Sequence, residues 1–249
     1  MILDRNLIIK IIEEPKLLID YIKGFYPRAC YDTRVALRLK GEKFNTVIDV
    51  GAYIGQYSRV YRYLFPEAKI YSFEPIKKNF ERLKKIEGIN PFNFALGDKT
   101  KKARIKVPGW EGGDGTFLPN EVNENWEEEE TEIKRFDTLG IKIERPCFLK
   151  IDVEGDEFNV LKGFGRLLNK VDIIEVEVFF NNKNNPQLFS LLNKHGFRTF
   201  IQKGLVQSKG QFNKHGCKTF FKEDLIQSKG KYVVNELFFI KHKKEGELY

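Results

Sequence analysis

Cysteine is scarce in this sequence. Only Cys30, Cys147 and Cys217 occur among 249 residues, and no two of them form a CxxC pair. An odd number of widely spaced cysteines supplies neither a disulfide framework nor the four ligands of a structural zinc site. A chain of this length buries roughly 70–75 % of the surface that it exposes when unfolded, so its fold does not require disulfides. We therefore predict a reducing, cytoplasmic location.

Long apolar runs are missing as well. No stretch reaches the ~18 consecutive apolar residues of a membrane-spanning helix. Residues 1–18 mix charged with apolar side chains, unlike the uninterrupted apolar core of a secretory signal. Charge of one sign is not in strong excess, because 43 Lys and Arg against 35 Asp and Glu leave only +8. So modest a surplus does not by itself indicate a nucleic-acid or membrane partner.

Several catalytic signatures are also absent. The chain has neither the GxSxG turn of α/β-hydrolases nor the HExxH pair of zinc proteases. It lacks the Gly-Lys-Ser/Thr triplet of a phosphate-binding loop as well. These absences argue against a serine hydrolase, a zinc protease and a P-loop nucleotide hydrolase.

Short apolar runs alternate with helical patterns along most of the chain. We predict strands at residues 46–50, 69–73, 91–95, 147–152 and 172–179, and helices at residues 55–64, 77–86 and 157–168. This alternation predicts parallel strands with right-handed helical connections, and therefore a doubly wound α/β sheet. We expect two or three helices in a helical extension over residues 1–44, followed by one domain over residues 45–249.

Two segments interrupt the alternation. Residues 103–107 and 132–136 predict two strands around a loop rich in glycine and acid, which we interpret as a β-hairpin insertion. Its glutamates at 127–130 predict a solvated loop rather than a metal site, because consecutive side chains on an extended chain point apart. Residues 191–230 hold two copies of a 20-residue repeat, too few for a solenoid. A duplication that lengthens a late hairpin explains His195 and His215 without a metal.

The strongest motif is Val-Ile-Asp-Val-Gly-Ala-Tyr-Ile-Gly-Gln-Tyr at residues 47–57. A buried strand carries Asp49, turns at Gly51 and enters a helix near Gly55. Glycines let a ligand approach the backbone, and a helix N-terminus offers free N–H groups. The dinucleotide fingerprint requires a second glycine where Tyr53 stands. The remaining pattern, Asp-x-Gly-x-x-x-Gly, is a nucleoside-binding turn used for S-adenosylmethionine, and we expect cofactor contacts at Asp49, Gly51, Tyr53 and Gly55.

The next two strands supply further candidates at the same edge of the sheet. Glu74 follows the second strand, 25 residues after Asp49, and an acidic residue at this place can accept both hydroxyls of a ribose. The third strand leads into a turn that brings Ala95, Leu96 or Asp98 near an adenine. Of these we assign Ala95 to the cofactor site.

The fourth strand carries charges that a covered strand normally avoids. Within residues 148–158, Lys150, Asp152 and Glu154 alternate with apolar residues toward the carboxyl end. Buried charges are costly unless they are paired or used in chemistry. The pattern therefore indicates either a functional site or an ion pair of Lys150 with one of the two acids.

Taken together, these segments resemble the FkbM-type family of S-adenosylmethionine-dependent methyltransferases. The resemblance covers residues 45–200 and lies in residues 47–57, 73–75, 93–98, 136–139, 149–155 and 160–163, of which Lys-Ile-Asp-Val-Glu-Gly at 150–155 is the most specific. It implies a class I, Rossmann-like sheet of seven strands whose last strand, at residues 233–240, is antiparallel. It also implies methylation of a hydroxyl oxygen on a saccharide or a small natural product.

Transfer of a methyl group to a hydroxyl is helped by a base, because a neutral hydroxyl is a poor nucleophile. The candidates at the carboxyl edge are Asp152, Glu154 and Glu177, with Glu175 less favoured. Asp152 is alternatively a ligand of the cofactor's amino group. The three favoured carboxylates are also able to share one divalent cation. We expect acid–base roles for them, and no metal.

Two other functions stay open. Enzymes that methylate base amino groups place Asn/Asp-Pro-Pro-aromatic after the fourth strand, and residues 152–155 are Asp-Val-Glu-Gly instead. A methyltransferase acting on RNA ribose is not excluded by this difference, although no RNA-binding module signature occurs. A non-catalytic binding module with the same fold is the third hypothesis. The expected partner is a small-molecule or glycan acceptor, and no feature of the sequence specifies an oligomeric state.

Overall fold

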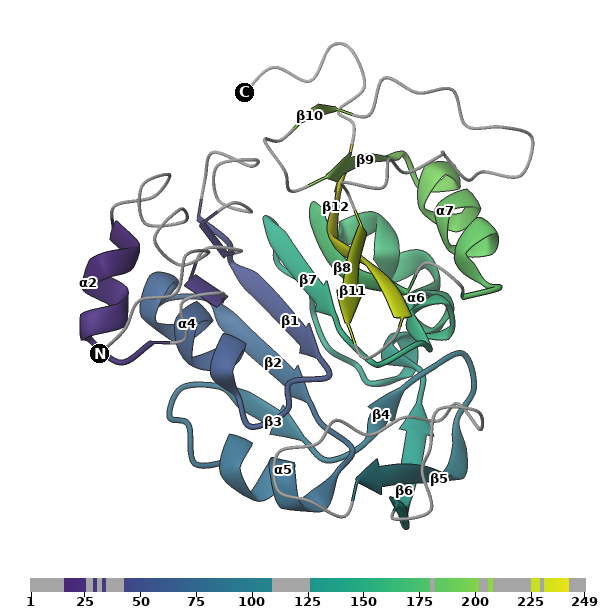
Figure 1. Cartoon of the computed structure of the whole chain (residues 1–249), viewed down its shortest axis with the longest axis horizontal. Helices are drawn as coiled ribbons and strands as arrows, with labels where there is room; N and C mark the ends of the chain where they lie inside the picture. Colours follow the sequence, from purple (N-terminus) through teal and green to yellow (C-terminus); the bar gives the residue numbers. More distant parts are fainter. Residues whose placement is uncertain are drawn as a thin grey trace.

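The computed structural model describes residues 16–25, 29–30, 33–34, 43–108, 126–179, 182–201, 206–207, 225–228 and 231–241. Its centre is a nine-stranded sheet (Figure 1) in the order β10-β9-β12-β8-β7-β1-β2-β3, with β11 paired to β12. The strands are β1 (Thr46–Val50), β2 (Lys69–Phe73), β3 (Asn90–Phe92), β7 (Cys147–Ile151), β8 (Ile173–Phe179), β9 (Phe197–Ile201), β10 (Val206–Gln207), β11 (Leu225–Ser228) and β12 (Lys231–Lys241). Among the helices of the described residues, none is long and apolar enough to cross a bilayer.

The sheet confirms the predicted doubly wound α/β fold. Strands β3, β2, β1, β7 and β8 are parallel, and β12 runs antiparallel between β8 and β9. These seven strands form the expected sheet with its antiparallel last strand. The predicted number of seven is nevertheless wrong for the whole sheet, because β10 and β11 extend it. Both extra strands come from corresponding positions of the two repeat copies, at Gln207 and Gln227.

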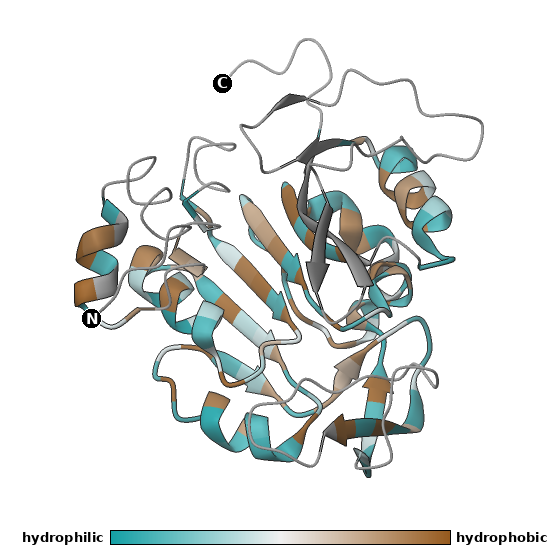
Figure 2. Cartoon of the chain, in the orientation of Figure 1, coloured by the Kyte–Doolittle hydropathy of each residue, from teal (hydrophilic) through white to brown (hydrophobic). Residues whose placement is uncertain are grey.

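Helices cover the central strands on both faces (Figure 1). They are α2 (Lys16–Ile22), α4 (Gln56–Leu64), α5 (Lys77–Leu83), α6 (Glu157–Phe164) and α7 (Asn185–Lys194). Side chains alternate between the faces of a strand, so β1 contributes Ile48 to the core under α6 and α7 but Val47 to the core under α4. Figure 2 shows hydrophobic residues along the central strands. Strands covered on both faces explain why their sequences are nearly continuous apolar runs.

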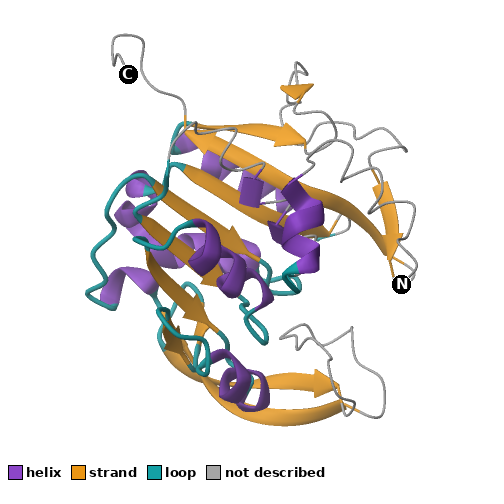
Figure 3. Cartoon of the chain, turned by 90° about the vertical axis from the view of Figure 1, so that its left-hand side faces the viewer, coloured by secondary structure: helices purple, strands orange, loops and turns teal. Residues whose placement is uncertain are grey.

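A smaller sheet of β4 (Ala95–Leu96), β6 (Trp126–Lys134) and β5 (Lys101–Pro108), in that order, lies beside the central sheet as a curved arm (Figure 3). It confirms the β-hairpin insertion, but the prediction of a solvated loop at residues 127–130 is wrong. These glutamates belong to β6, where Glu128 lies opposite Lys106 and Glu130 opposite Arg104. Opposite charges on facing strands stabilise the pairing, which the isolated acidic run did not reveal.

The predicted third strand is split in two. Residues 90–92 belong to the central sheet as β3, whereas Ala95 pairs with Ile133 in the smaller sheet. Asn93 turns the chain between them, because its side-chain amide donates to the carbonyls of Glu74 (2.9 Å) and Pro75 (3.0 Å).

Three other predictions either differ from the structure or extend beyond the described residues. The helix predicted to reach residue 168 ends at Phe164 and continues as a 3₁₀ segment, Gly165–Lys170, after a positive φ of 51° at Gly165. In the segment 1–44, the described residues contain α2 and further helical residues at 29–30 and 33–34, in agreement with the expectation of more than one helix. The rest of that segment lies outside the described part of the chain. Of the two repeat copies, residues 202–205, 208–224 and 229–230 likewise lie outside the described part of the chain, and so does His215.

Candidate active site

The site begins with a row of polar side chains on the face of the sheet covered by α4. The strand register aligns Ser72 of β2 with Asp49 of β1, Asp49 with Lys150 of β7, and Lys150 with Glu175 of β8. All four are buried, with exposed fractions of 0 to 3 %. Two residues earlier, the same four strands place apolar side chains on this face: Ile70, Val47, Phe148 and Ile173. The face therefore changes from apolar to charged as the strands approach their carboxyl ends.

Lys150 is the central cation of this row. Its ammonium donates to Oδ2 of Asp152 at 2.7 Å and lies 4.3 Å from the ring centroid of Tyr57. Burial lowers the pKa of Lys150, but the charges of Asp152, Glu175 and Asp49 outweigh burial and raise it above its ordinary value. Lys150 therefore stays protonated and compensates acidic side chains on three adjacent strands.

Asp49 lies beneath the turn that follows β1. The hydroxyl of Ser58, on α4, donates to Oδ2 of Asp49 at 2.6 Å and lies 2.8 Å from the hydroxyl of Ser72. Oδ1 of Asp49 has no hydrogen-bond partner among the described residues. Burial raises the pKa of Asp49, although the charge of Lys150 opposes the shift. A buried acceptor without a donor, next to the nucleoside-binding turn, is compatible with a bound polar ligand.

The carboxyl edge carries the three predicted catalytic acids. Oxygen atoms of Asp152, Glu154 and Glu177 lie within 4.8 Å of one another, and all three residues are half-buried. The neighbouring charge of Asp152, together with burial, raises the pKa of Glu177 to about 9. At neutral pH the pair of Glu177 and Asp152 therefore holds one proton, in a hydrogen bond between the two carboxyl groups. The oxygens are also close enough to ligate a single cation, so the expectation of no metal stays a prediction.

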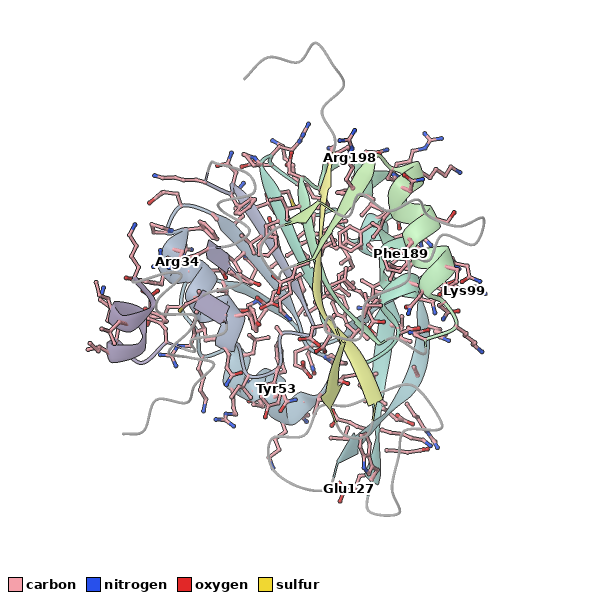
Figure 4. All side chains as sticks on the ribbon, turned by 45° about the horizontal axis from the view of Figure 1, so that its top comes forward. Arg34, Tyr53, Lys99, Glu127, Phe189 and Arg198 are labelled. Carbon is pink, nitrogen blue, oxygen red and sulfur yellow. The ribbon has the colours of Figure 1, made fainter. Side chains whose placement is uncertain are left out.

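The glycine turn lies directly against this cluster. Gly51 has a φ of 81°, and a Cβ at this position would overlap the carbonyl oxygen of Asp152. Gly51 is therefore required for the close approach of the turn to the end of β7. Tyr53 also has a positive φ, 52°, and Figure 4 labels it at the edge of the sheet. Two positive φ values within three residues are a sign of backbone strain, and such strain is common in turns that bind ligands.

Glu74 is fixed at the end of β2. Its carboxylate accepts the backbone N–H of Tyr53 (2.9 Å) and of Ile76 (2.9 Å), and the residue is 4 % exposed. A carboxylate that joins the turns after β1 and β2 lies where the sequence predicts a ribose ligand. A cavity of about 590 Å³ borders the next residue, Pro75, and is lined on its other side by Lys102 and Arg104 of β5.

The structure thus brings most of the predicted residues together at one edge. Ala95 is buried within β4, so its contact with an adenine stays a prediction. Glu154 has a positive φ of 55°, so the chain turns after β7 and does not continue as a strand. The sequence motifs did not indicate a role in the site for Tyr57, Ser58 or Ser72. Alignment of β1 and β2 by their apolar residues would have found Ser72, but the positions of Tyr57 and Ser58 depend on how α4 packs.

Comparison with known proteins agrees with this geometry. Residues 49–199 match the family model described as the methyltransferase FkbM domain. Methyltransferase sdnD of Sordaria araneosa is 26 % identical over 70 % of this chain and 80 % of its own length. Methyltransferase 1 of Beauveria bassiana is 23 % identical over 76 % of this chain and 84 % of its own.

Among solved structures, the magnesium protoporphyrin IX methyltransferase of Synechocystis PCC 6803 with bound S-adenosylmethionine covers 86 % of this chain and 79 % of its own, at 10 % identity and a TM-score of 0.46. The family match spans more than half of the chain and includes Asp49, Glu74, the carboxylates after β7 and Glu177 of β8. The chain therefore belongs to the FkbM family of methyltransferases, whose methyl donor is S-adenosylmethionine.

Proposed function

We propose that this methyltransferase acts on a hydroxyl oxygen of a saccharide or a small natural product. The observation that supports this proposal is the cluster of Asp152, Glu154 and Glu177 beside the glycine turn. Three carboxylate groups at one edge are suited to an acceptor with several hydroxyls, because each carboxylate accepts hydrogen bonds from O–H donors. One of them also provides the base that a hydroxyl nucleophile requires.

S-adenosylmethionine supplies the methyl group from a sulfonium centre. On the protein side, we assign the ribose hydroxyls to Glu74 and the amino acid end to the turn of Gly51 and Tyr53. The orphaned Oδ1 of Asp49 and the absence of a side chain at Gly51 are features of the chain that fit such a ligand. Gly55 and Ala95 complete the proposed cofactor site.

Asp152 and Glu177 have different roles in acid–base catalysis. Lys150 donates to Asp152, which favours its ionised form, whereas Glu177 is raised to a pKa of about 9 and carries the proton. We assign Asp152 as the base that accepts the hydroxyl proton. Glu177 holds Asp152 in place by its hydrogen bond, and Glu154 orients a neighbouring hydroxyl of the acceptor.

Calorimetric titration with S-adenosylhomocysteine tests the cofactor site. Wild type should bind it, and Glu74→Ala should weaken binding by about 1–3 kcal/mol, the cost of hydrogen bonds to ribose left unmade. Glu127→Gln, an exposed glutamate near the outer end of the arm (Figure 4), is the matched control and should bind as wild type does. Absence of binding by folded wild type would reject the methyltransferase function in favour of a non-catalytic module.

A methyl-transfer screen tests the acceptor. Radiolabelled S-adenosylmethionine should transfer its methyl group to members of a panel of saccharides and small hydroxylated natural products, and not to RNA oligonucleotides. Asp152→Asn should reduce turnover by roughly 10²–10⁴-fold, the usual contribution of a general base, while the enzyme still binds S-adenosylhomocysteine. Transfer to RNA ribose alone would replace the saccharide proposal by the ribose alternative.

A further inference from the structure

A second cavity lies on the outer side of the glycine turn. It has a volume of about 780 Å³ and is bordered by residues of α4, the end of α5 and the segment after α2. None of the carboxylates Asp152, Glu154 and Glu177 is among its described lining residues. The volume is within the range of roughly 300–1,000 Å³ found for small-molecule sites. The cavity is therefore large enough to bind a small molecule away from the carboxylates at which methyl transfer is proposed.

Gly55 sets how closely two of the elements that border this cavity pack against each other. Its φ is 85°, and a Cβ here would overlap the side chain of Ile86 and lie 2.9 Å from that of Leu83. The absence of a side chain thus lets the turn after α5 pack against the first turn of α4. Arg59, three residues after Gln56 on α4, then faces the same cavity as Arg82 at the end of α5.

Three cations are among the described residues that line the cavity, and Lys85 also interacts electrostatically with Glu81 on α5. Arg59, Arg82 and Lys85 form no ion pair or side-chain hydrogen bond with another described residue. Elsewhere in the described chain, arginines are commonly paired with acids, as Arg135 is with Asp137. One carboxylate, Glu87, also lines the cavity, so the described lining residues carry three positive charges and one negative charge, a net charge of +2. A phosphate monoester carries about 1.5 to 2 negative charges at neutral pH and complements this value.

The remaining wall is apolar. Phe25, Ile54 and Ile86 are half-buried and border the same cavity. We propose that the cavity binds a phosphate monoester with an apolar body. The two guanidinium groups provide the planar donor pairs that suit phosphate oxygens, and the three apolar side chains contact the body of the ligand. This inference goes beyond the proposed function, because it does not depend on which hydroxyl receives the methyl group.

Calorimetric titration with three probes tests the site. Phenyl phosphate should bind at least about tenfold more tightly than inorganic phosphate, and phenol should show no binding, since charge and apolar contact act together. Arg59→Gln and Arg82→Gln should each weaken phenyl phosphate binding by roughly fivefold or more. Arg166→Gln is the matched control, because Arg166 is exposed, has no ion pair among the described residues and lies outside the cavity lining.

Unchanged affinity in the double variant Arg59→Gln/Arg82→Gln would overturn the proposal, as would phenyl phosphate binding no better than inorganic phosphate. A single-stranded RNA with a 5′-hydroxyl that binds more tightly through the same arginines would replace the monoester by a nucleic-acid backbone. S-adenosylhomocysteine is titrated into every variant, because unchanged binding shows that the protein is folded. Failure of wild type to bind S-adenosylhomocysteine would reject the proposed function but leave phenyl phosphate binding as a separate result.

Discussion

Replacing Glu177 by glutamine should flatten the pH dependence of stability. Glu177 has a pKa of about 9 in the folded protein, against an ordinary value of 4.5. Because the folded state binds this proton more tightly, its stabilising contribution is complete below pH 4.5 and is lost as the pH rises through 9. The slope is about 1.4 kcal/mol per pH unit for one proton, so wild type should lose up to about 3 kcal/mol between about pH 6 and 8.

Urea denaturation at a series of pH values measures this effect. Glu177→Gln keeps a hydrogen-bond donor for Asp152 but has no proton to lose. Between about pH 6 and 8 its free energy of unfolding should therefore lack the loss of up to about 3 kcal/mol that we expect for wild type. Burial raises the pKa of Glu157 to about 8, so Glu157 also makes stability fall as the pH rises. This contribution is present in both proteins and does not affect the difference between their slopes. Glu127→Gln, on the exposed arm, should keep the wild-type slope. Parallel slopes for wild type and Glu177→Gln would refute the shared proton between Glu177 and Asp152.

Three further predictions follow from buried positions. Lys150→Met should lower the free energy of unfolding by about 3–5 kcal/mol in urea denaturation, because it leaves Asp152 and the neighbouring carboxylates without their cation; a loss below about 1 kcal/mol would contradict the central role of Lys150. Gly51→Ala should destabilise by about 2–4 kcal/mol in the same assay, because its φ is 81° and its Cβ would overlap the carbonyl of Asp152. Cys147 should resist iodoacetamide until the protein unfolds, since burial raises its pKa well above the ordinary value, and peptide mass spectrometry of the native protein measures this.

The central strands were predictable because their environment is uniform. Residues 46–50 and 69–73 have the predicted bounds of β1 and β2, since strands covered on both faces must be apolar along their length. The same rule made the charges of Lys150 and Asp152 conspicuous, because a covered strand excludes charge that is neither paired nor used. The sequence therefore indicated the site through its exceptions to the core pattern.

Features that depend on contacts between distant segments were not predictable. Glutamates 127–130 belong to a strand that pairs with β5, where Lys106 and Arg104 lie opposite Glu128 and Glu130. The ion pair of Arg104 with Glu128 joins residues 24 positions apart, which a local sequence pattern does not reveal. The turn at Asn93 depends on the carbonyls of Glu74 and Pro75. The role of Gly55 belongs to the same class: its sequence context predicts a ligand-binding turn, whereas the structure adds the packing of Ile86 against α4.

Along one face of the sheet, the apolar residues stabilise the fold, whereas the charged residues that follow them on the same strands belong to the candidate active site. Val47 and Phe148 lie in a core that water does not reach, and burial of such side chains stabilises the fold by roughly 1.5–3 kcal/mol each. Asp49 and Lys150, two residues further along the same strands, contribute little net stability, because the cost of removing charges from water offsets their attraction. Well-packed apolar residues at these two positions would stabilise the sheet as well or better. The charged row is therefore explained by what it holds at the carboxyl edge, where Lys150 donates to Asp152 in its ionised form.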